Sequence, residues 1–197
     1  MKLSELKGKR IHFIGIGGSG MSGLARIAIS HGIKVSGSDA SDSSVLDALR
    51  ALGATTFIGH DAKNIDGADL IVYSNAIKSQ NPERAAAVKT GILEITRASA
   101  LALLMSESTS IAIAGTHGKT TTSSMATVAL QSAGVDPSFA IGGVLKSSGS
   151  NAHRGSGKYF IAEADESDGS FVAYHPYAAV ITNVEWDHVD HFETETE

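Results

Sequence analysis

The chain has 197 residues, of which 42% are hydrophobic and 19% are charged, with no cysteine and a formal net charge of -5. The length favours one large or two small domains, and the composition is that of a globular protein with a buried core. The acidic balance excludes a non-specific nucleic-acid binder, and the lack of cysteine excludes disulfides and thiolate metal sites. Neither a signal peptide nor an apolar stretch of membrane-spanning length is recognised, so we expect a cytoplasmic protein without a membrane partner.

Apolar runs bounded by glycine or polar turns alternate with segments of helical period, which is typical of parallel strands joined by crossover helices. We therefore predict an α/β fold throughout. In the first half the expected strands are residues 10–15, 34–39 and 69–74, and the expected helices are residues 21–30, 43–53 and 82–91. A strand at 110–115 and a helix at 119–133 begin a second series, which predicts two domains, 1–106 and 107–197.

The later part of the chain is richer in glycine and serine. Residues 142–157 are expected to be loop for much of their length. On either side of them, residues 158–168 and 177–192 each indicate a strand that runs into a polar turn. Both turns would lie at the carboxyl ends of strands, where open parallel sheets bind ligands.

A first glycine loop follows the first predicted strand. Gly15, Gly17 and Gly20 fit the pattern G-x-G-x-x-G before a predicted helix, and Asp39 ends the next strand. Such glycines let backbone amides approach a pyrophosphate, and the acid can accept hydrogen bonds from a ribose. The loop predicts a nucleotide-diphosphate ligand rather than NAD in particular. The alternatives are a tight turn without a ligand and the site of an NAD dehydrogenase.

A second glycine loop, "GTHGKT", follows the apolar segment at 110–115 and opens a helix. A Walker A loop in this register requires glycine at position 113, where Ile113 stands. Lys119 can still reach terminal phosphates and the hydroxyl of Thr120 can still bind Mg²⁺, so we predict phosphate binding. A lysine that merely caps a surface turn would explain neither the glycine before it nor the threonines after it.

Two polar turns could hold a metal beside this loop. Glu163 is the acidic residue best placed to project from a strand end, although an acidic run can also be a solvated loop. His188 follows the last predicted strand, and histidine is a common ligand of catalytic divalent ions. A lone histidine such as His191 is more often structural.

Six stretches in this order resemble the Mur ligases, which build the peptide of bacterial cell-wall precursors: "HFIGIGGSGMSGLARI", "VSGSD", "SNAIK", "GTHGKTTT", "EADESDGSF" and "TNVEWDHVDH". The resemblance runs through essentially the whole chain. The ATP loop of that family has the short form G-T-[HN]-G-K-[ST], so Ile113 is no defect. Gly18 to Met21 resemble the alanine-adding member more than the ligase that recycles murein tripeptide.

The resemblance implies a role for each matching position. The UDP part of UDP-N-acetylmuramate would lie against Gly15, Gly17, Gly18, Gly20, Met21, Asp39, Ser74, Asn75 and Ala76. ATP would lie against Gly115, Thr116, His117, Gly118, Lys119, Thr120 and Thr121. Thr120 and Glu163 would bind one Mg²⁺, His188 would serve a second metal position, and residues 142–152 would approach the muramyl group.

The implied reaction is the ATP-dependent ligation of L-alanine to UDP-N-acetylmuramate in peptidoglycan synthesis, on which cell shape and division depend. The lactyl carboxylate would attack the γ-phosphate to give an acyl phosphate, and the alanine amine would displace phosphate. Lys119 and the metals, one of them on His188, would offset the charge that builds during transfer.

Members of the Mur ligase family are more than twice as long as this chain. We therefore expect the chain alone to be inactive, with an unpaired sheet edge that favours self-association. Two other classes stay open. A nicotinamide-dependent oxidoreductase would leave "GTHGKTTT" without a purpose, and a non-catalytic nucleotide-binding module would use both loops for binding only.

Overall fold

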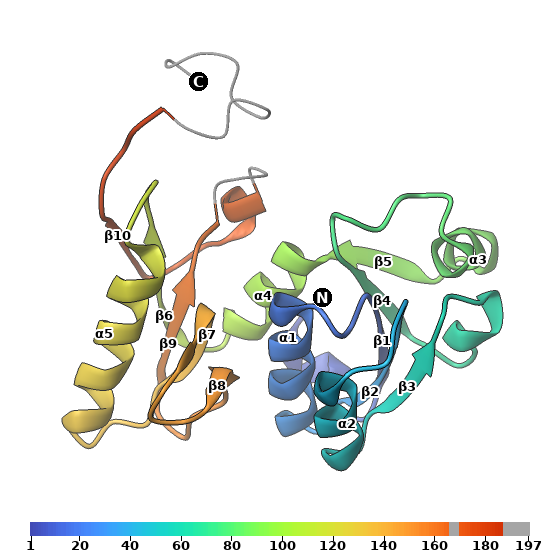
Figure 1. Cartoon of the computed structure of the whole chain (residues 1–197), viewed down its shortest axis with the longest axis horizontal. Helices are drawn as coiled ribbons and strands as arrows, with labels where there is room; N and C mark the ends of the chain where they lie inside the picture. Colours follow the sequence, from blue (N-terminus) through green and yellow to red (C-terminus); the bar gives the residue numbers. More distant parts are fainter. Residues whose placement is uncertain (166–169, 187–197) are drawn as a thin grey trace. The chain divides into compact units, whose positions relative to one another are not determined.

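The structure, a computed structural model, describes residues 1–165 and 170–186. The chain divides into two compact units, Met1–Leu104 and Met105–Glu197, each built around its own five-stranded sheet (Figure 1). This confirms the predicted α/β class. The division of the chain into compact units falls after Leu104, and the predicted domain boundary falls after residue 106.

The first unit is a parallel sheet with helices on both faces. Its strands lie in the order β3-β2-β1-β4-β5. They are β1 (Arg10–Ile14), β2 (Lys34–Asp39), β3 (Thr55–Ile58), β4 (Leu70–Tyr73) and β5 (Leu93–Thr96). The helices are α1 (Ser19–Ser30), α2 (Ser44–Ala51), α3 (Pro82–Thr90) and α4 (Arg97–Met105), with 3₁₀ turns η1 (Leu3–Leu6) and η2 (Ala62–Ile65).

The order of the strands reverses beside β1. The chain runs outward from β1 to β2 and β3, then returns to β4 on the other side of β1 and continues to β5. Open parallel sheets bind ligands at such a switch point, outside the carboxyl ends of the strands. The first glycine loop follows β1 and therefore lies at this edge.

Successive side chains of β1 point to opposite faces of the sheet. Phe13 faces the side covered by α1 and α4, where it lines a small cavity together with Ala28 and Leu104. Ile14 faces the other side and packs with Ile65 of η2 and with Ala87 of α3. All of these side chains are buried, so the sheet is covered on both faces, as an all-parallel sheet requires.

Local sequence signals set several helix ends. The Ser43 hydroxyl accepts a hydrogen bond from the Leu46 amide at the start of α2. Asn81 caps α3, Pro82 occupies its first turn, and Gly91 ends it with a φ of 73°. The helix α1 begins two residues before the predicted position 21, because the chain already turns into the helix after Gly18.

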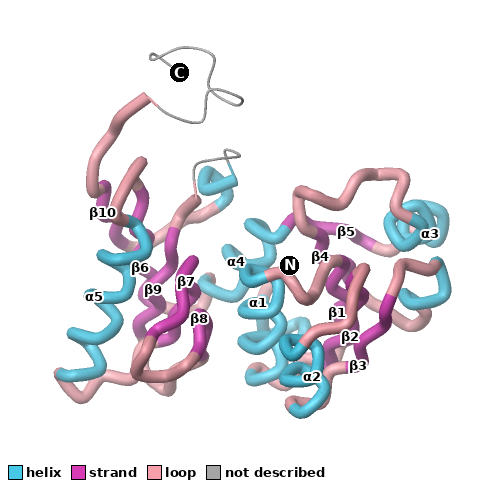
Figure 2. Tube along the Cα trace, in the orientation of Figure 1, coloured by secondary structure: helices cyan, strands magenta, loops and turns pink. Residues whose placement is uncertain are grey.

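The second unit contains a sheet of order β10-β6-β9-β7-β8 (Figure 2). Its strands are β6 (Thr109–Ala114), β7 (Ser138–Leu145), β8 (Ser150–His153), β9 (Tyr159–Glu163) and β10 (Ala178–Ile181). The helix α5 (Lys119–Ser132) packs on this sheet, and η3 (Ser170–Ala173) precedes β10. The pairing of β7 with β8 is antiparallel, and the other pairings are parallel.

The hairpin of β7 and β8 divides the stretch 142–157, which was expected to be loop for much of its length. Residues 146–149 and 154–157 lie outside strands, whereas 142–145 and 150–153 lie in the two strands of the hairpin. The turn between them ends at Gly149, which has a φ of 64°. Leu145 and Ala152 are buried and hold the hairpin in place. The many serines and glycines around these two apolar residues concealed the strands.

The strand β10 lies at one edge of the second sheet, and all four of its residues are exposed. Self-association through such an edge remains a prediction. Among the described residues, no helix is both long enough and apolar enough to cross a membrane.

Candidate nucleotide-binding sites

The first glycine loop is held at the carboxyl edge of its sheet by backbone hydrogen bonds. The amides of Gly15 and Ile16 both donate to the carbonyl oxygen of Ser38 in β2, at 2.8 and 3.0 Å. Gly15 has a φ of 82°, a conformation that glycine adopts without strain. These contacts fix the path of the loop into α1, where the first amides of the helix have no intrahelical acceptor.

Asp39 at the end of β2 contacts this loop directly. Its Oδ2 accepts a hydrogen bond of 2.8 Å from the Gly17 amide. A Cβ atom on Gly17 would lie 2.8 Å from that oxygen and 2.9 Å from Leu46 Cδ1, so any side chain there would have to displace them. The structure therefore brings together the loop and the acid that the sequence predicted, and the acid helps to hold the loop.

The other residues predicted for the first site lie at the same edge, but they differ in exposure. The segment after β4 approaches the loop, since a Cβ atom on Gly15 would lie 3.9 Å from Ser74 Cβ. Asn75 and Ala76 follow Ser74 in a turn that the 2.8 Å bond from Ile77 N to Ser74 O closes. Met21 is buried and belongs to the core, so its backbone amide is the part suited to a ligand.

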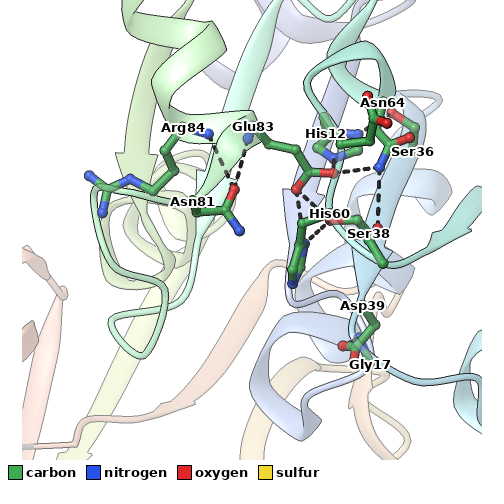
Figure 3. A network of polar contacts seen from close by, with 12 residues as sticks. His12, Gly17, Ser36, Ser38, Asp39, His60, Asn64, Asn81, Glu83 and Arg84 are labelled. Atoms are coloured by element: carbon green, nitrogen blue, oxygen red, sulfur yellow. Dashed lines mark hydrogen bonds and ion pairs between the residues drawn. The ribbon is translucent and has the colours of Figure 1, made fainter.

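A buried polar network, which the sequence analysis missed, lies on the α3 side of the sheet (Figure 3). The Glu83 carboxylate is fully buried and accepts hydrogen bonds from Ser38 Oγ at 2.6 Å and Asn64 Nδ2 at 2.7 Å. His12 Nε2 lies 3.6 Å from it and His60 Nδ1 lies 3.1 Å from it.

The pKa of Glu83 reflects these partners. Burial by itself raises the pKa of the carboxyl, but the contact with His12 and the hydrogen bonds from Ser38 and Asn64 outweigh it. Together they lower the pKa from 4.5 to about 2. Glu83 is therefore a carboxylate at neutral pH, and it supports the strand end that carries the first loop.

The second glycine loop joins β6 to α5 and is the candidate phosphate-binding loop of the second unit. Lys119 Nζ donates to the carbonyl oxygens of Gly115 at 2.7 Å and Thr116 at 3.2 Å, so its side chain folds back over the loop. Gly118, at the start of α5, has a φ of 81°. A helix amino terminus of this kind attracts anions through its amides and its dipole.

Ile113 occupies the position where a longer phosphate loop carries glycine. It lies in β6 and is buried against Phe139 and Ile161. Position 113 thus belongs to the core of the sheet, and the loop begins only at Gly115. The structure explains the missing glycine by the extra length of the strand.

Glu163 lies beside the second loop, as the sequence predicted. It is the last residue of β9, which is next to β6 in the sheet. Its Oε1 accepts a hydrogen bond of 2.8 Å from Thr120 Oγ1, and its Oε2 accepts one of 2.7 Å from the Gly142 amide. A hydroxyl and a carboxylate in contact are hard oxygen ligands, which suit Mg²⁺.

The segment after β10 lies along the second loop and includes residues that sequence reasoning did not assign. The side chain of Asn183 accepts from the His117 amide at 2.9 Å and donates to the His117 carbonyl at 3.1 Å. Thr182 Oγ1 donates to the same carbonyl at 2.6 Å. The stretch "TNVE" after a predicted strand was the available signal, but its pairing with the loop needed the order of the sheet.

The metal ligands expected from the sequence remain a prediction. Among the described residues, no three histidine or acidic side chains converge as a metal cluster. His188 lies outside the described residues, and so does His191. The contact of Thr120 with Glu163 is therefore the candidate metal-binding feature of the described chain.

Comparisons with known proteins agree with these two units. Residues 10–109 match the family model described as "Mur ligase family, catalytic domain", and residues 113–197 match the one described as "Mur ligase middle domain". A UDP-N-acetylmuramate--L-alanine ligase from Nocardioides sp. is 55% identical over 94% of this chain and 42% of its own length. The ligase of the same name from Mycobacterium tuberculosis is 53% identical over 93% of this chain and 38% of its own length.

Solved structures of the same family share the fold. A UDP-N-acetylmuramate-alanine ligase from Thermotoga maritima matches 94% of this chain and 44% of its own with a TM-score of 0.85 and 32% identity. A UDP-N-acetylmuramate:L-alanyl-gamma-D-glutamyl-meso-diaminopimelate ligase from Neisseria meningitides matches 93% of this chain and 63% of its own, with a TM-score of 0.85 and 38% identity. The chain spans about two fifths of the length of the alanine ligases that it matches.

Proposed function

This chain belongs to the Mur ligase family, and we propose that it supplies the sugar-nucleotide and ATP sites of a cytoplasmic ligase that joins L-alanine to UDP-N-acetylmuramate. The observation that carries the proposal is the presence of two glycine loops, each at the carboxyl end of its own sheet. One loop is paired with Asp39 and the other with Lys119 and Glu163. Two nucleotide ligands with different roles account for both.

In this proposal the first loop binds the UDP group. The loop amides and the amino terminus of α1 face the diphosphate, and Asp39 accepts hydrogen bonds from the ribose. The hydrogen bond from the Gly17 amide to Asp39 holds the carboxylate beside the loop. The turn at residues 74–76 closes the other side of the switch point, since it follows β4.

The second loop binds ATP and activates the acid substrate. Lys119 exchanges its two loop carbonyls for the terminal phosphates, whose negative charge it offsets during transfer. Thr120 and Glu163 would hold Mg²⁺, and a second metal position at His188 stays part of the proposal. A bound Mg²⁺ supplies charge neutralisation to the phosphates.

The reaction proceeds in two displacements. A lactyl carboxylate oxygen attacks the γ-phosphorus, the bond from that phosphorus to the β–γ bridging oxygen breaks, and ADP leaves. The amine nitrogen of alanine then attacks the acyl carbon, and inorganic phosphate leaves with the former carboxylate oxygen while the amine loses a proton. Activation is necessary because an unmodified carboxylate has no leaving group that an amine can displace.

A calorimetric titration of this chain with UDP-N-acetylmuramate, with NADH as a parallel ligand, tests the first site. We expect the sugar nucleotide to bind and NADH not to bind. Binding of NADH in its place would favour the oxidoreductase alternative, and binding of neither would contradict the proposal. A Gly17→Ala variant, whose Cβ would meet Asp39, is expected to lose the binding and so to locate it at this loop.

A further inference from the structure

The first glycine loop contains no cation of its own. Residues 15–21 and 74–76 include neither lysine nor arginine, and the nearby Asp39 adds a negative charge. The second loop differs, because Lys119 lies within it. A nucleoside diphosphate carries negative charge on both phosphates. The first loop would face this charge with backbone amides and a helix dipole only, and none of its side chains would supply a positive charge.

The register of the sheet brings Arg97 to this edge. Ile14 of β1 lies opposite Tyr73 of β4, and Tyr73 lies opposite Thr96 of β5. These three residues end their strands, so the next residues of the chain, 15, 74 and 97, are the first beyond the edge of the sheet. Arg97 therefore begins α4 at the level of the glycine loop, although about 80 residues separate them in the sequence.

Gly20 shows where the Arg97 side chain lies. A Cβ atom on Gly20 would be 3.2 Å from both Cδ and Nη1 of Arg97. Gly20 is the second residue of α1, so the guanidinium lies against the first turn of that helix. The amides of the first turn have no acceptor within the helix and form the part of α1 that attracts an anion. A side chain at position 20 would crowd the arginine.

The base of Arg97 is fixed by the core. Its neighbour Ala98 is 3% exposed and Leu101, one turn later, is 4% exposed. Both anchor α4, and Arg97 itself is half-buried. The backbone that carries the guanidinium is therefore fixed, and its half-buried side chain has less conformational freedom to lose on binding.

We propose that Arg97 binds the diphosphate of the sugar nucleotide at the first turn of α1. The planar guanidinium donates paired hydrogen bonds to phosphate oxygens, in a geometry that lysine cannot reproduce. A side chain at position 20 would press on the arginine in this position. The inference rests on the proposed function of the first loop, and it makes Arg97 a binding residue rather than a catalytic one.

The test compares uridine with UDP as ligands in calorimetric titrations of the wild-type chain and of Arg97→Ala, Arg97→Lys and Arg26→Ala. Arg26 is the matched control, since it lies on α1 almost two turns beyond Gly20. We expect Arg97→Ala to weaken UDP binding about tenfold or more and uridine binding less than about twofold. Arg97→Lys should fall between, and Arg26→Ala should match the wild type.

The ratio of the UDP affinity to the uridine affinity separates a loss of phosphate contacts from a folding defect. An unfolded fraction would lower the apparent affinities for both ligands by the same factor and would leave the ratio unchanged. If Arg97→Ala leaves the UDP-to-uridine ratio unchanged, Arg97 only packs against α1 and the inference is overturned. If the wild-type chain binds neither UDP nor UDP-N-acetylmuramate, the proposed function itself fails and the inference fails with it. If the wild type binds both and the ratio collapses in Arg97→Ala, the inference stands.

Discussion

Ser38 connects the buried carboxylate of Glu83 to the first glycine loop. Its hydroxyl donates to Glu83 Oε2 at 2.6 Å, and its backbone carbonyl accepts the amides of Gly15 and Ile16. The end of β2 is thus held from the α3 side by a charge and from the loop side by the backbone. A change at Glu83 should therefore affect both the stability of the first unit and the order of its loop.

We predict that Glu83→Gln destabilises the first unit by about 3 kcal/mol at pH 7, the free energy that a shift from 4.5 to about 2 represents. Because the folded-state pKa lies below the ordinary value, the carboxylate stabilises the fold above pH 4.5. That contribution is lost as the pH falls from 4.5 towards 2. Urea unfolding at pH 7, 4 and 3 should show the difference between wild type and variant shrinking on acidification.

Glu5→Gln is the control for this series, because Glu5 is exposed. It should change the free energy of unfolding by less than about 0.5 kcal/mol at neutral pH. A deficit for Glu83→Gln that is the same at pH 7 and pH 3 would show that the carboxylate charge contributes nothing, and that only side-chain shape matters.

We predict that Gly17→Ala and Gly18→Ala differ in stability although they are adjacent. A Cβ at position 17 would lie 2.8 Å from Asp39 Oδ2, whereas the nearest atom to one at position 18 is the Gly15 carbonyl oxygen at 3.4 Å. Gly18 also has an ordinary φ of -61°. Thermal unfolding should show a loss of about 1–3 kcal/mol for Gly17→Ala and less than about 1 kcal/mol for Gly18→Ala. Equal melting temperatures would contradict the close approach of Asp39.

The elements of the first unit could be predicted where local chemistry decides them. Asn81, Pro82 and Gly91 mark both ends of α3 in the sequence, and the structure places the helix between them. The strand β3 was missed, because "TTFI" is short and its residues are exposed or half-buried. A strand at the edge of a sheet carries less of the apolar signal on which sequence reasoning depends.

The candidate sites were predictable only in part, for a related reason. The glycine loops are local motifs, and Asp39 and Glu163 lie at the ends of strands that the pattern shows. The network around Glu83 joins β1, β2, η2 and α3, and no spacing in the sequence pairs Glu83 with His12 or Asn64. Contacts between elements depend on strand order, which the sequence pattern leaves open.

We predict that Lys119→Ala lowers the affinity of this chain for ATP about tenfold or more. The ammonium group supplies the positive charge of the second loop. It donates hydrogen bonds to the carbonyls of Gly115 and Thr116, which keep it beside the amino terminus of α5. The control is Lys158→Ala, which removes the same charge just before β9, at the opposite end of that strand from Glu163. Titrations with ATP measure both, and equal affinities would exclude Lys119 from phosphate binding.

We predict that Glu163→Gln removes most of the Mg²⁺ dependence of ATP binding. The amide keeps an oxygen for the Thr120 hydroxyl but lacks the charge that a divalent cation requires. ATP affinity should fall about tenfold in Mg²⁺ and stay within about twofold in EDTA. Glu107→Gln, on the chain before β6, should keep the wild-type dependence. An unchanged response of Glu163→Gln to Mg²⁺ would place the metal elsewhere.

We predict that Asn183 orders the second loop before any nucleotide binds. Its side chain closes a ring with the backbone of His117, accepting from the amide and donating to the carbonyl. In Asn183→Ala, hydrogen exchange at the His117 amide should accelerate about tenfold, the equivalent of one lost hydrogen bond. Asn183→Asp keeps the acceptor and should retain much of the protection. The Ala112 amide in β6 reports the sheet itself, and it should exchange at the wild-type rate in both variants. Faster exchange at Ala112 as well would mean that Asn183 supports the whole unit, and an unchanged rate at His117 would mean that the loop is ordered by Thr182 and Lys119 instead.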